Sequence, residues 1–249
     1  MKYLLFFLSL TAVFHIHAAA LGRFDSVSGN WHVKTDHFAC TFLEGSMFPG
    51  EFRFSNGKTP GIILFRDTAT GKDGKTYALY EERRAETQII RNDKTHFIIE
   101  RTGGFFRNSS PVITPLQGVK VTCRYEFEKN SSAVRLRITY RKTKETICTI
   151  NSGLRLVWYY TNPFTTLSAG GKTENFVLSG NKKIRFWDVP RQLTLAGKEA
   201  EVTLQAPRAI ASLSRDRNYP CSLNGGRWQY QWRKEDTLTD EAVLLLKAK

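Results

Sequence analysis

The sequence predicts an all-β protein, an antiparallel β-sandwich with little helix. Apolar residues recur at every second position in many short segments, and turn residues separate these segments. No segment shows a sustained helical period. Apolar residues make up 41% of the 249 residues, which suffices for a sizeable core and excludes a disordered chain.

The strongest pair of strands spans residues 119–127 and 134–141. In each strand apolar side chains alternate with polar ones, the pattern of a strand with one buried face. Residues 129–132 (KNSS) form a four-residue hairpin loop, which sets the register. With that loop Tyr125 faces Leu136 on the core side of the sheet.

The remaining strands follow from the same alternation and from turn signals such as Asn56-Gly57 and Asp73-Gly74. We expect them at 31–34, 37–43, 51–54, 61–66, 76–80, 86–91, 95–100, 146–150, 153–160, 175–178, 183–189, 200–205, 209–214, 227–233 and 242–247. A short C-terminal helix capped by Thr239 is an alternative for the last of these. The segment 67–74 (DTATGKDG) lacks the acidic spacing of a calcium loop, so we expect a solvated turn there.

Residues 1–20 have the layout of a secretory signal peptide. Lys2 precedes an apolar run over residues 3–14, and Ala18-Ala19-Ala20 forms a small-residue cleavage site. Twelve apolar residues are too few for a membrane anchor, which needs about 20. We therefore expect a secreted or periplasmic protein without a membrane anchor, in which residues 21–249 form a single β-sandwich domain.

An exported protein can form disulfides, and the chain has four cysteines, Cys40, Cys123, Cys148 and Cys221. None lies in a C-x-x-C pair, which argues against a zinc ribbon or a thioredoxin-type site. Two disulfides with three possible connectivities are one interpretation. Free buried cysteines are the other.

The net charge is +14, and it falls to +13 over residues 21–249 once Lys2 is removed. The predicted hairpin places several of the basic residues on its wet face: Lys120, Arg124, Arg135, Arg137 and Arg141. Such a face attracts anionic partners. An acidic polysaccharide, an anionic lipid and nucleic acid are candidate partners, and export disfavours nucleic acid. An ordinary solvated sheet face is the competing interpretation.

Aromatic side chains suggest a carbohydrate site. Trp158, Tyr159 and Tyr160 close one strand, and Trp228 and Trp232 share a face of another. Sugar rings have apolar faces that stack on aromatic rings, and Arg124 and Arg137 offer partners for sugar carboxylates. The competing interpretation is that these rings belong to the core of the sandwich.

Motifs for catalysis are missing from the sequence. It holds no G-x-S-x-G elbow, no phosphate-binding loop and no H-E-x-x-H, and we expect neither a metal nor another cofactor. His32 and His37 flank Asp36, which could orient an imidazole as a base, although an ordinary strand-to-turn segment has the same pattern. His96 fits a surface position. His37 and Tyr159 are weak candidates for a catalytic base.

The order of these features resembles the galactose mutarotase-like β-supersandwich, the fold of aldose epimerases and of β-domains in many polysaccharide lyases and glycosidases. The resemblance rests on the early segment 31–35 (WHVKT), the long pair over 118–141, and the segment 153–160 (GLRLVWYY) with the short strands that end near Leu246. Epimerases of this family use a His and a Glu as acid and base, and neither falls on a matching motif here. The chain is also short for a complete family enzyme. The resemblance implies a glycan context for an exported β-protein.

The sequence thus favours an exported β-sandwich that binds carbohydrate, with an acidic polysaccharide as the expected ligand. A carbohydrate-active enzyme, either a polysaccharide lyase or an epimerase, is the first alternative. A structural or adhesion module that binds another protein is the second.

Overall fold

The computed structural model describes residues 20–58, 61–65, 67–79, 82–109, 112–142, 148–157, 164–175, 183–185, 191–205, 212–215, 222–232 and 237–249. In strands that include 61–65, 148–157 and 222–232 it describes the backbone alone. Every strand pairing in this part of the chain is antiparallel. No helix in it is long and apolar enough to cross a membrane.

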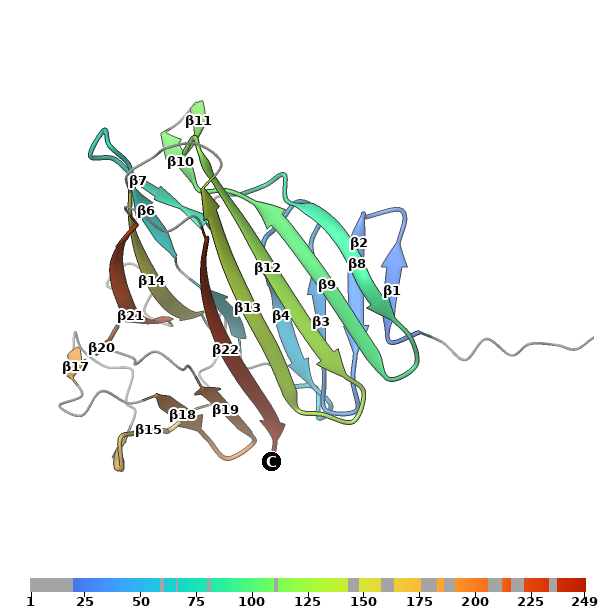
Figure 1. Cartoon of the computed structure of the whole chain (residues 1–249). Coiled ribbons are helices and arrows are strands. Elements are labelled where there is room, and N and C mark those ends of the chain that lie inside the picture. The colour runs from blue at the N-terminus through green and yellow to red at the C-terminus, as the bar shows by residue number, and fades with distance from the viewer. Residues whose placement is uncertain are drawn as a thin grey trace, which may run out of the picture.

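Two sheets form a sandwich (Figure 1). The 13-stranded sheet has the order β1 (Gly22–Asp25), β2 (Asn30–Lys34), β3 (Phe38–Phe42), β4 (Pro49–Phe54), β5 (Gly61–Phe65), β14 (Cys148–Val157), β6 (Thr68–Thr70), β7 (Thr76–Ala78), β10 (Phe106–Ser109) and β11 (Val112–Pro115). Off this path, β21 (Ser222–Trp232) pairs with β14, and β20 (Ser212–Arg215) joins β21 to β17 (Lys183–Arg185).

The nine-stranded sheet has the order β16 (Lys172–Asn175), β15 (Thr166–Ala169), β18 (Gln192–Ala196), β19 (Ala200–Gln205), β22 (Thr237–Ala248), β13 (Ala133–Lys142), β12 (Val119–Glu128), β9 (His96–Gly103) and β8 (Glu86–Asn92). Figure 1 shows β12 and β13 in front of β3 and β4 of the other sheet. The predicted all-β antiparallel sandwich is confirmed.

The core between the sheets is built from the alternation that the sequence displays. Along β12 every second side chain is buried, and Tyr125 and Phe127 pack against rings of β3. The ring centroids of Phe42 lie 5.0 Å from Tyr125 and 5.9 Å from Phe127. These edge-to-face contacts add to the burial of large apolar side chains and hold the two sheets together.

The predicted hairpin register is confirmed. Tyr125 pairs with Leu136, Arg124 with Arg137, and Glu126 with Arg135, around a turn at Lys129-Asn130. The C-terminal segment is a strand rather than a helix, since β22 pairs along almost its whole length with β13 and β19.

The segment 67–74 differs from the solvated turn that the sequence predicted. Asp67 is fully buried, and its carboxylate accepts a hydrogen bond of 2.6 Å from the Tyr140 hydroxyl, which is also fully buried. Residues 68–70 form β6, and the exposed turn follows after them. A buried carboxylate is tolerable here because it has a strong hydrogen-bond donor.

Two disulfides are excluded, because Cys40 and Cys123 are free and buried. They sit on β3 and β12 in opposite sheets as small apolar side chains, and burial raises the pKa of both thiols far above its usual value. Cys221 lies outside the described residues.

Candidate functional site

Most of the predicted aromatic site lies outside the part of the chain that the structure describes. Trp158, Tyr159 and Tyr160 all fall there. The backbone of β21 places Trp228 opposite Ser152 and Trp232 opposite Cys148. The two tryptophans are four positions apart on the strand, and no register shift lies between them. Stacking of sugars on these rings therefore remains a prediction.

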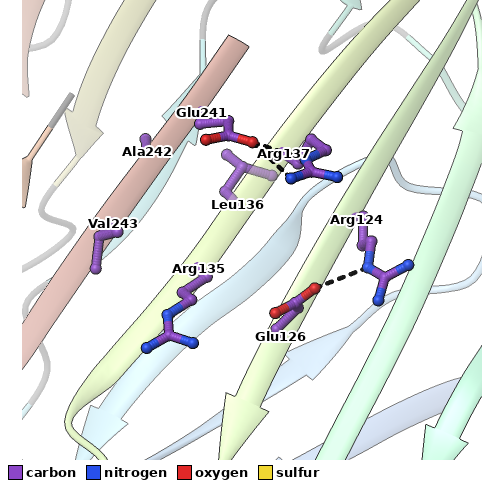
Figure 2. Close-up of a pocket in the computed structure, with 8 residues that line it drawn as sticks. All are labelled: Arg124, Glu126, Arg135, Leu136, Arg137, Glu241, Ala242 and Val243. Carbon is purple, nitrogen blue, oxygen red and sulfur yellow. Dashed lines mark hydrogen bonds and ion pairs between the residues drawn. The ribbon is translucent and has the colours of Figure 1, made fainter. Parts of the chain in front are cut away.

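The predicted basic face exists as a surface, and three of its five cations, Arg124, Arg135 and Arg137, are paired with carboxylates. Lys120 and Arg141 are exposed and form no ion pair among the described residues. The Arg124 Nε atom donates to Glu126 at 2.8 Å, and its Nη1 atom lies 3.5 Å from Glu100. Arg137 binds Glu241 through Nε at 2.8 Å and through Nη2 at 2.7 Å. Figure 2 shows the Arg124–Glu126 and Arg137–Glu241 pairs among the residues that line a depression of about 140 Å³ on the outer face of the sheet. Because each arginine has its own carboxylate, the direct Arg124–Arg137 opposition costs little.

The structure does not bring the predicted arginines and the predicted aromatic strand together. Arg124 and Arg137 point away from the core on the nine-stranded sheet, whose opposite face packs on β3. Trp228 and Trp232 belong to β21 in the 13-stranded sheet. A composite site with members from both groups would have to span the thickness of the sandwich, about 10 Å between sheets.

A larger basic concavity lies at one end of the sandwich. Three turns meet there: the Asp36 amide donates to the Lys129 carbonyl at 2.8 Å, and the Lys129 amide donates to the Thr95 carbonyl at 2.8 Å. The Leu21 amide, just before β1, donates to the Asp93 carbonyl at 2.8 Å. The turns β2–β3, β8–β9 and β12–β13 accordingly lie along one edge of the molecule in Figure 1.

We name this concavity the end groove. It is open, has a volume of about 700 Å³, and is lined by Ala20, Leu21, Arg23, His32, Val33, Lys34, Ala39, Cys40, Thr41, Lys94 and Lys129. Its walls come from β1, β2 and β3 of one sheet and from two turns of the other.

Four exposed cations surround the end groove: Arg23, Lys34, Lys94 and Lys129. Within the described part of the chain none of them forms an ion pair. This contrasts with the outer face of the nine-stranded sheet, where Arg124, Arg135 and Arg137 are all paired. A concave surface lined by charges of one sign concentrates ions of the opposite sign.

Two nearby carboxylates, those of Asp93 and Asp25, are engaged elsewhere, whereas the exposed Asp36 in the β2–β3 turn has no side-chain hydrogen bond or ion pair among the described residues. Asp93 accepts hydrogen bonds from the Thr95 and His96 amides, both at 2.8 Å, and from the Arg91 side chain. The Thr95 amide and the Arg91 guanidinium hold the pKa of Asp93 well below its usual value. Asp25 binds the Ser28 hydroxyl and the Val27 amide, which lower its pKa as well. These acids stabilise their own turns instead of covering the groove cations.

His32 is the histidine that lines the end groove. Its Nδ1 atom lies 3.0 Å from the Thr41 hydroxyl, and the ring is half-buried. His37, the predicted base, lies outside the groove lining, and its Nε2 atom is 3.1 Å from the Asn130 carbonyl. A carbonyl accepts only, so Nε2 of His37 carries the proton. Among the described residues no hydrogen bond links Asp36 to either histidine, so Asp36 does not orient an imidazole here.

The sequence interpretation missed the groove because its cations are far apart in the chain. Lys94 and Lys129 sit at turn positions, where lysine is unremarkable, and Arg23 precedes the first predicted strand. A usable signal was present. Asn92-Asp93 and Lys129-Asn130 are turns of adjacent hairpins in the same antiparallel sheet, so both turns had to lie at the same end of the sandwich.

Comparison with known proteins shows the fold. No protein-family model matches the sequence, and no curated protein matches it significantly. Among solved structures, galactose 1-epimerase from Lactobacillus acidophilus superposes with a TM-score of 0.59 at 9% identity, over 88% of this chain and 94% of the epimerase. The chain therefore has the galactose mutarotase-like β-supersandwich fold, as the sequence resemblance implied.

Larger glycoside hydrolases share this fold over part of their length. An α-mannosidase from Enterococcus faecalis matches with a TM-score of 0.62 at 9% identity, over 93% of this chain and 30% of the enzyme. A family 36 α-galactosidase from Geobacillus stearothermophilus matches with a TM-score of 0.55 at 8% identity, over 92% of this chain and 41% of the enzyme. The chain thus spans well under half of these hydrolases.

Proposed function

We propose that this protein is an exported β-sandwich that binds an acidic carbohydrate in the end groove. The observation that carries the proposal is the set of four cations, Arg23, Lys34, Lys94 and Lys129, which surround an open groove without ion pairs in the described part of the chain. Export is proposed from the signal-peptide layout of residues 1–20.

The fold supports carbohydrate as the ligand class. The matched solved structures include a galactose epimerase, an α-mannosidase and an α-galactosidase. The charge of the groove supports a carboxylated sugar over a neutral one, because arginine binds carboxylates bidentately and lysine binds them as a point charge. An extended uronate polymer fits an open groove with cations from several elements better than a compact ligand does.

Affinity electrophoresis in gels that contain polygalacturonate tests this proposal. We expect the protein to be retarded, and we expect the retardation to weaken as salt rises, because exposed ion pairs are screened. The fully methyl-esterified polymer is the matched ligand control. It keeps the sugar backbone but has no carboxylate, and retardation should disappear.

A pair of double variants locates the site. Lys94→Gln with Lys129→Gln removes two groove cations, and at about 1 kcal/mol each the affinity should fall about tenfold or more. Arg124→Gln with Arg137→Gln removes the same charge from the outer face, where both arginines are paired with carboxylates, and should change the affinity less than about twofold. Equal losses in both double variants contradict the groove assignment, and no retardation by any acidic glycan contradicts the function.

Lyase activity is the second candidate, and the position of His32 favours it. A polysaccharide lyase works by β-elimination: a base removes the C5 proton of a uronate while a cation neutralises the uronate carboxylate. The C4–O bond then breaks as the C4=C5 double bond forms, and the leaving oxygen takes up a proton. His32 lies beside Arg23 and Lys34 in the groove. Ultraviolet absorbance of the unsaturated uronate, lost in His32→Gln, would establish the activity. Its absence with retained binding leaves the binding function.

A further inference from the structure

The chain enters the end groove at the predicted signal-peptide boundary. Ala20 is exposed and lines the groove, whereas Leu21 is buried, with 7% of its surface exposed. Among the described residues, which begin at Ala20, Leu21 is the first that is buried in the sandwich, and it directly follows the Ala18-Ala19-Ala20 sequence.

The anchoring of Leu21 and Gly22 is specific. The Leu21 amide donates to the Asp93 carbonyl at 2.8 Å. The Asn92 side chain forms two hydrogen bonds with the backbone of Gly22, which we call the Asn92 clamp. Its Oδ1 atom accepts from the Gly22 amide and its Nδ2 atom donates to the Gly22 carbonyl, each at 2.9 Å. A Cβ atom on Gly22 would lie 2.3 Å from the Phe97 ring, so the backbone rests directly on the core. Cleavage before Leu21 would leave all of these contacts in place.

We propose that signal-peptide removal after Ala20 creates a fifth cation of the end groove, the α-ammonium group of Leu21. Hydrolysis adds water across the Ala20–Leu21 peptide bond, so that Ala20 leaves as a carboxylate and Leu21 keeps the new amino group. An unperturbed α-amino group is mostly protonated at pH 7. One of its protons stays with the Asp93 carbonyl, and the space that Ala20 occupied opens the other two to the groove.

Processing then completes the ligand site. The Leu21 ammonium joins Arg23, Lys34, Lys94 and Lys129 around the same concavity, and it replaces the amide of an unprocessed chain, which bears no net charge. Its place is fixed by the backbone of β1 and by Asn92, whereas the lysine ammonium groups stand on flexible stems. A preorganised cation loses less freedom on binding an anion than a mobile one does. This inference rests on the proposed export and on the proposed binding of acidic carbohydrate.

Two measurements test it. The mass of the protein recovered from an exporting host gives the cleavage position, and we expect Leu21 as the first residue; a different first residue overturns the inference. Affinity for polygalacturonate is then compared between the chain over 21–249 and the same chain carrying a single Nα-acetyl group. Acetylation should weaken binding about two- to fivefold, which is what one exposed ion pair contributes.

A chain that begins at Ala19 is the matched control, because its amino group comes two residues before Leu21 in the sequence. Acetylation of this control should have a smaller effect than acetylation at Leu21. Equal affinities of the free and acetylated Leu21 forms, with the Lys94 and Lys129 variants still impaired, overturn this inference and leave the proposed function intact. Absence of polygalacturonate binding by every form overturns both.

Discussion

Gly45 packs closely against the segment that precedes β8, and this contact allows the effect of Gly45→Ala on the free energy of unfolding to be predicted. Gly45 has φ of +67°, a region that an L-residue enters at a cost of about 1–2 kcal/mol. A Cβ atom there would lie 2.1 Å from the Arg83 carbonyl oxygen, far inside contact distance. The two segments would have to separate, and the 2.9 Å hydrogen bond from the Ala85 amide to the Gly45 carbonyl would be lost. That hydrogen bond contributes about 1 kcal/mol.

Gly45→Ala should therefore lower the free energy of unfolding by about 3 kcal/mol, from the backbone conformation, the lost hydrogen bond and the displaced segment. Gly57→Ala is the matched control, since Gly57 has φ of +79° and a Cβ atom there would meet no other atom within 4 Å. It should cost only about 1 kcal/mol, because the lower entropy of the unfolded alanine chain offsets part of the conformational strain. Urea denaturation of the three proteins measures both values. Equal destabilisation in the two variants would refute the steric argument.

Two further predictions concern Asn92 and Asp93, at the end of β8 next to the end groove. Asn92→Ala removes both hydrogen bonds of the Asn92 clamp and should lower the free energy of unfolding by about 1–3 kcal/mol in urea denaturation; an unchanged midpoint contradicts the clamp. The second prediction concerns Asp93, whose pKa lies well below its usual value, chiefly because its carboxylate accepts a hydrogen bond from the Thr95 amide. The ionised carboxylate therefore stabilises the native state above the pKa of the unfolded chain, which is about 4. This stabilisation disappears as the pH falls below that value. Asp93→Asn should therefore be less stable than the parent at pH 7, with a difference that shrinks between about pH 4 and pH 2 in thermal denaturation; a constant difference contradicts the assignment.

The predicted elements were most accurate where local alternation was uninterrupted. The register of β12 and β13 follows from their side-chain pattern and their loop length, and the structure reproduces it residue by residue. The sequence predicts residues 146–150 and 153–160 as two separate strands. The structure continues one strand, β14, through the gap between them. β14 pairs with β5 and β6 on one edge and β21 on the other, and a register shift between Ser152 and Gly153 absorbs the irregularity.

The charges show the limit of sequence reasoning. The hairpin pattern placed Arg137 on a wet face, and Arg137 is there. Its partner Glu241 lies on β22, 104 residues away, and becomes a neighbour only through the pairing of β13 with β22. Three arginines of the expected basic surface, Arg124, Arg135 and Arg137, are therefore paired with carboxylates, while four cations without ion pairs in the described part of the chain line the end groove.

By itself the sequence determined the fold class, the central hairpin with its register and the buried face of each clean strand, because these depend on alternation over a few neighbouring residues. The tertiary structure decided which charges meet. Coulomb attraction depends on distance in space, and the distance between two side chains on separate strands is set by sheet order, which no local pattern encodes. For that reason the basic excess was visible in the composition, but the meeting of Arg23, Lys34, Lys94 and Lys129 around one groove was not.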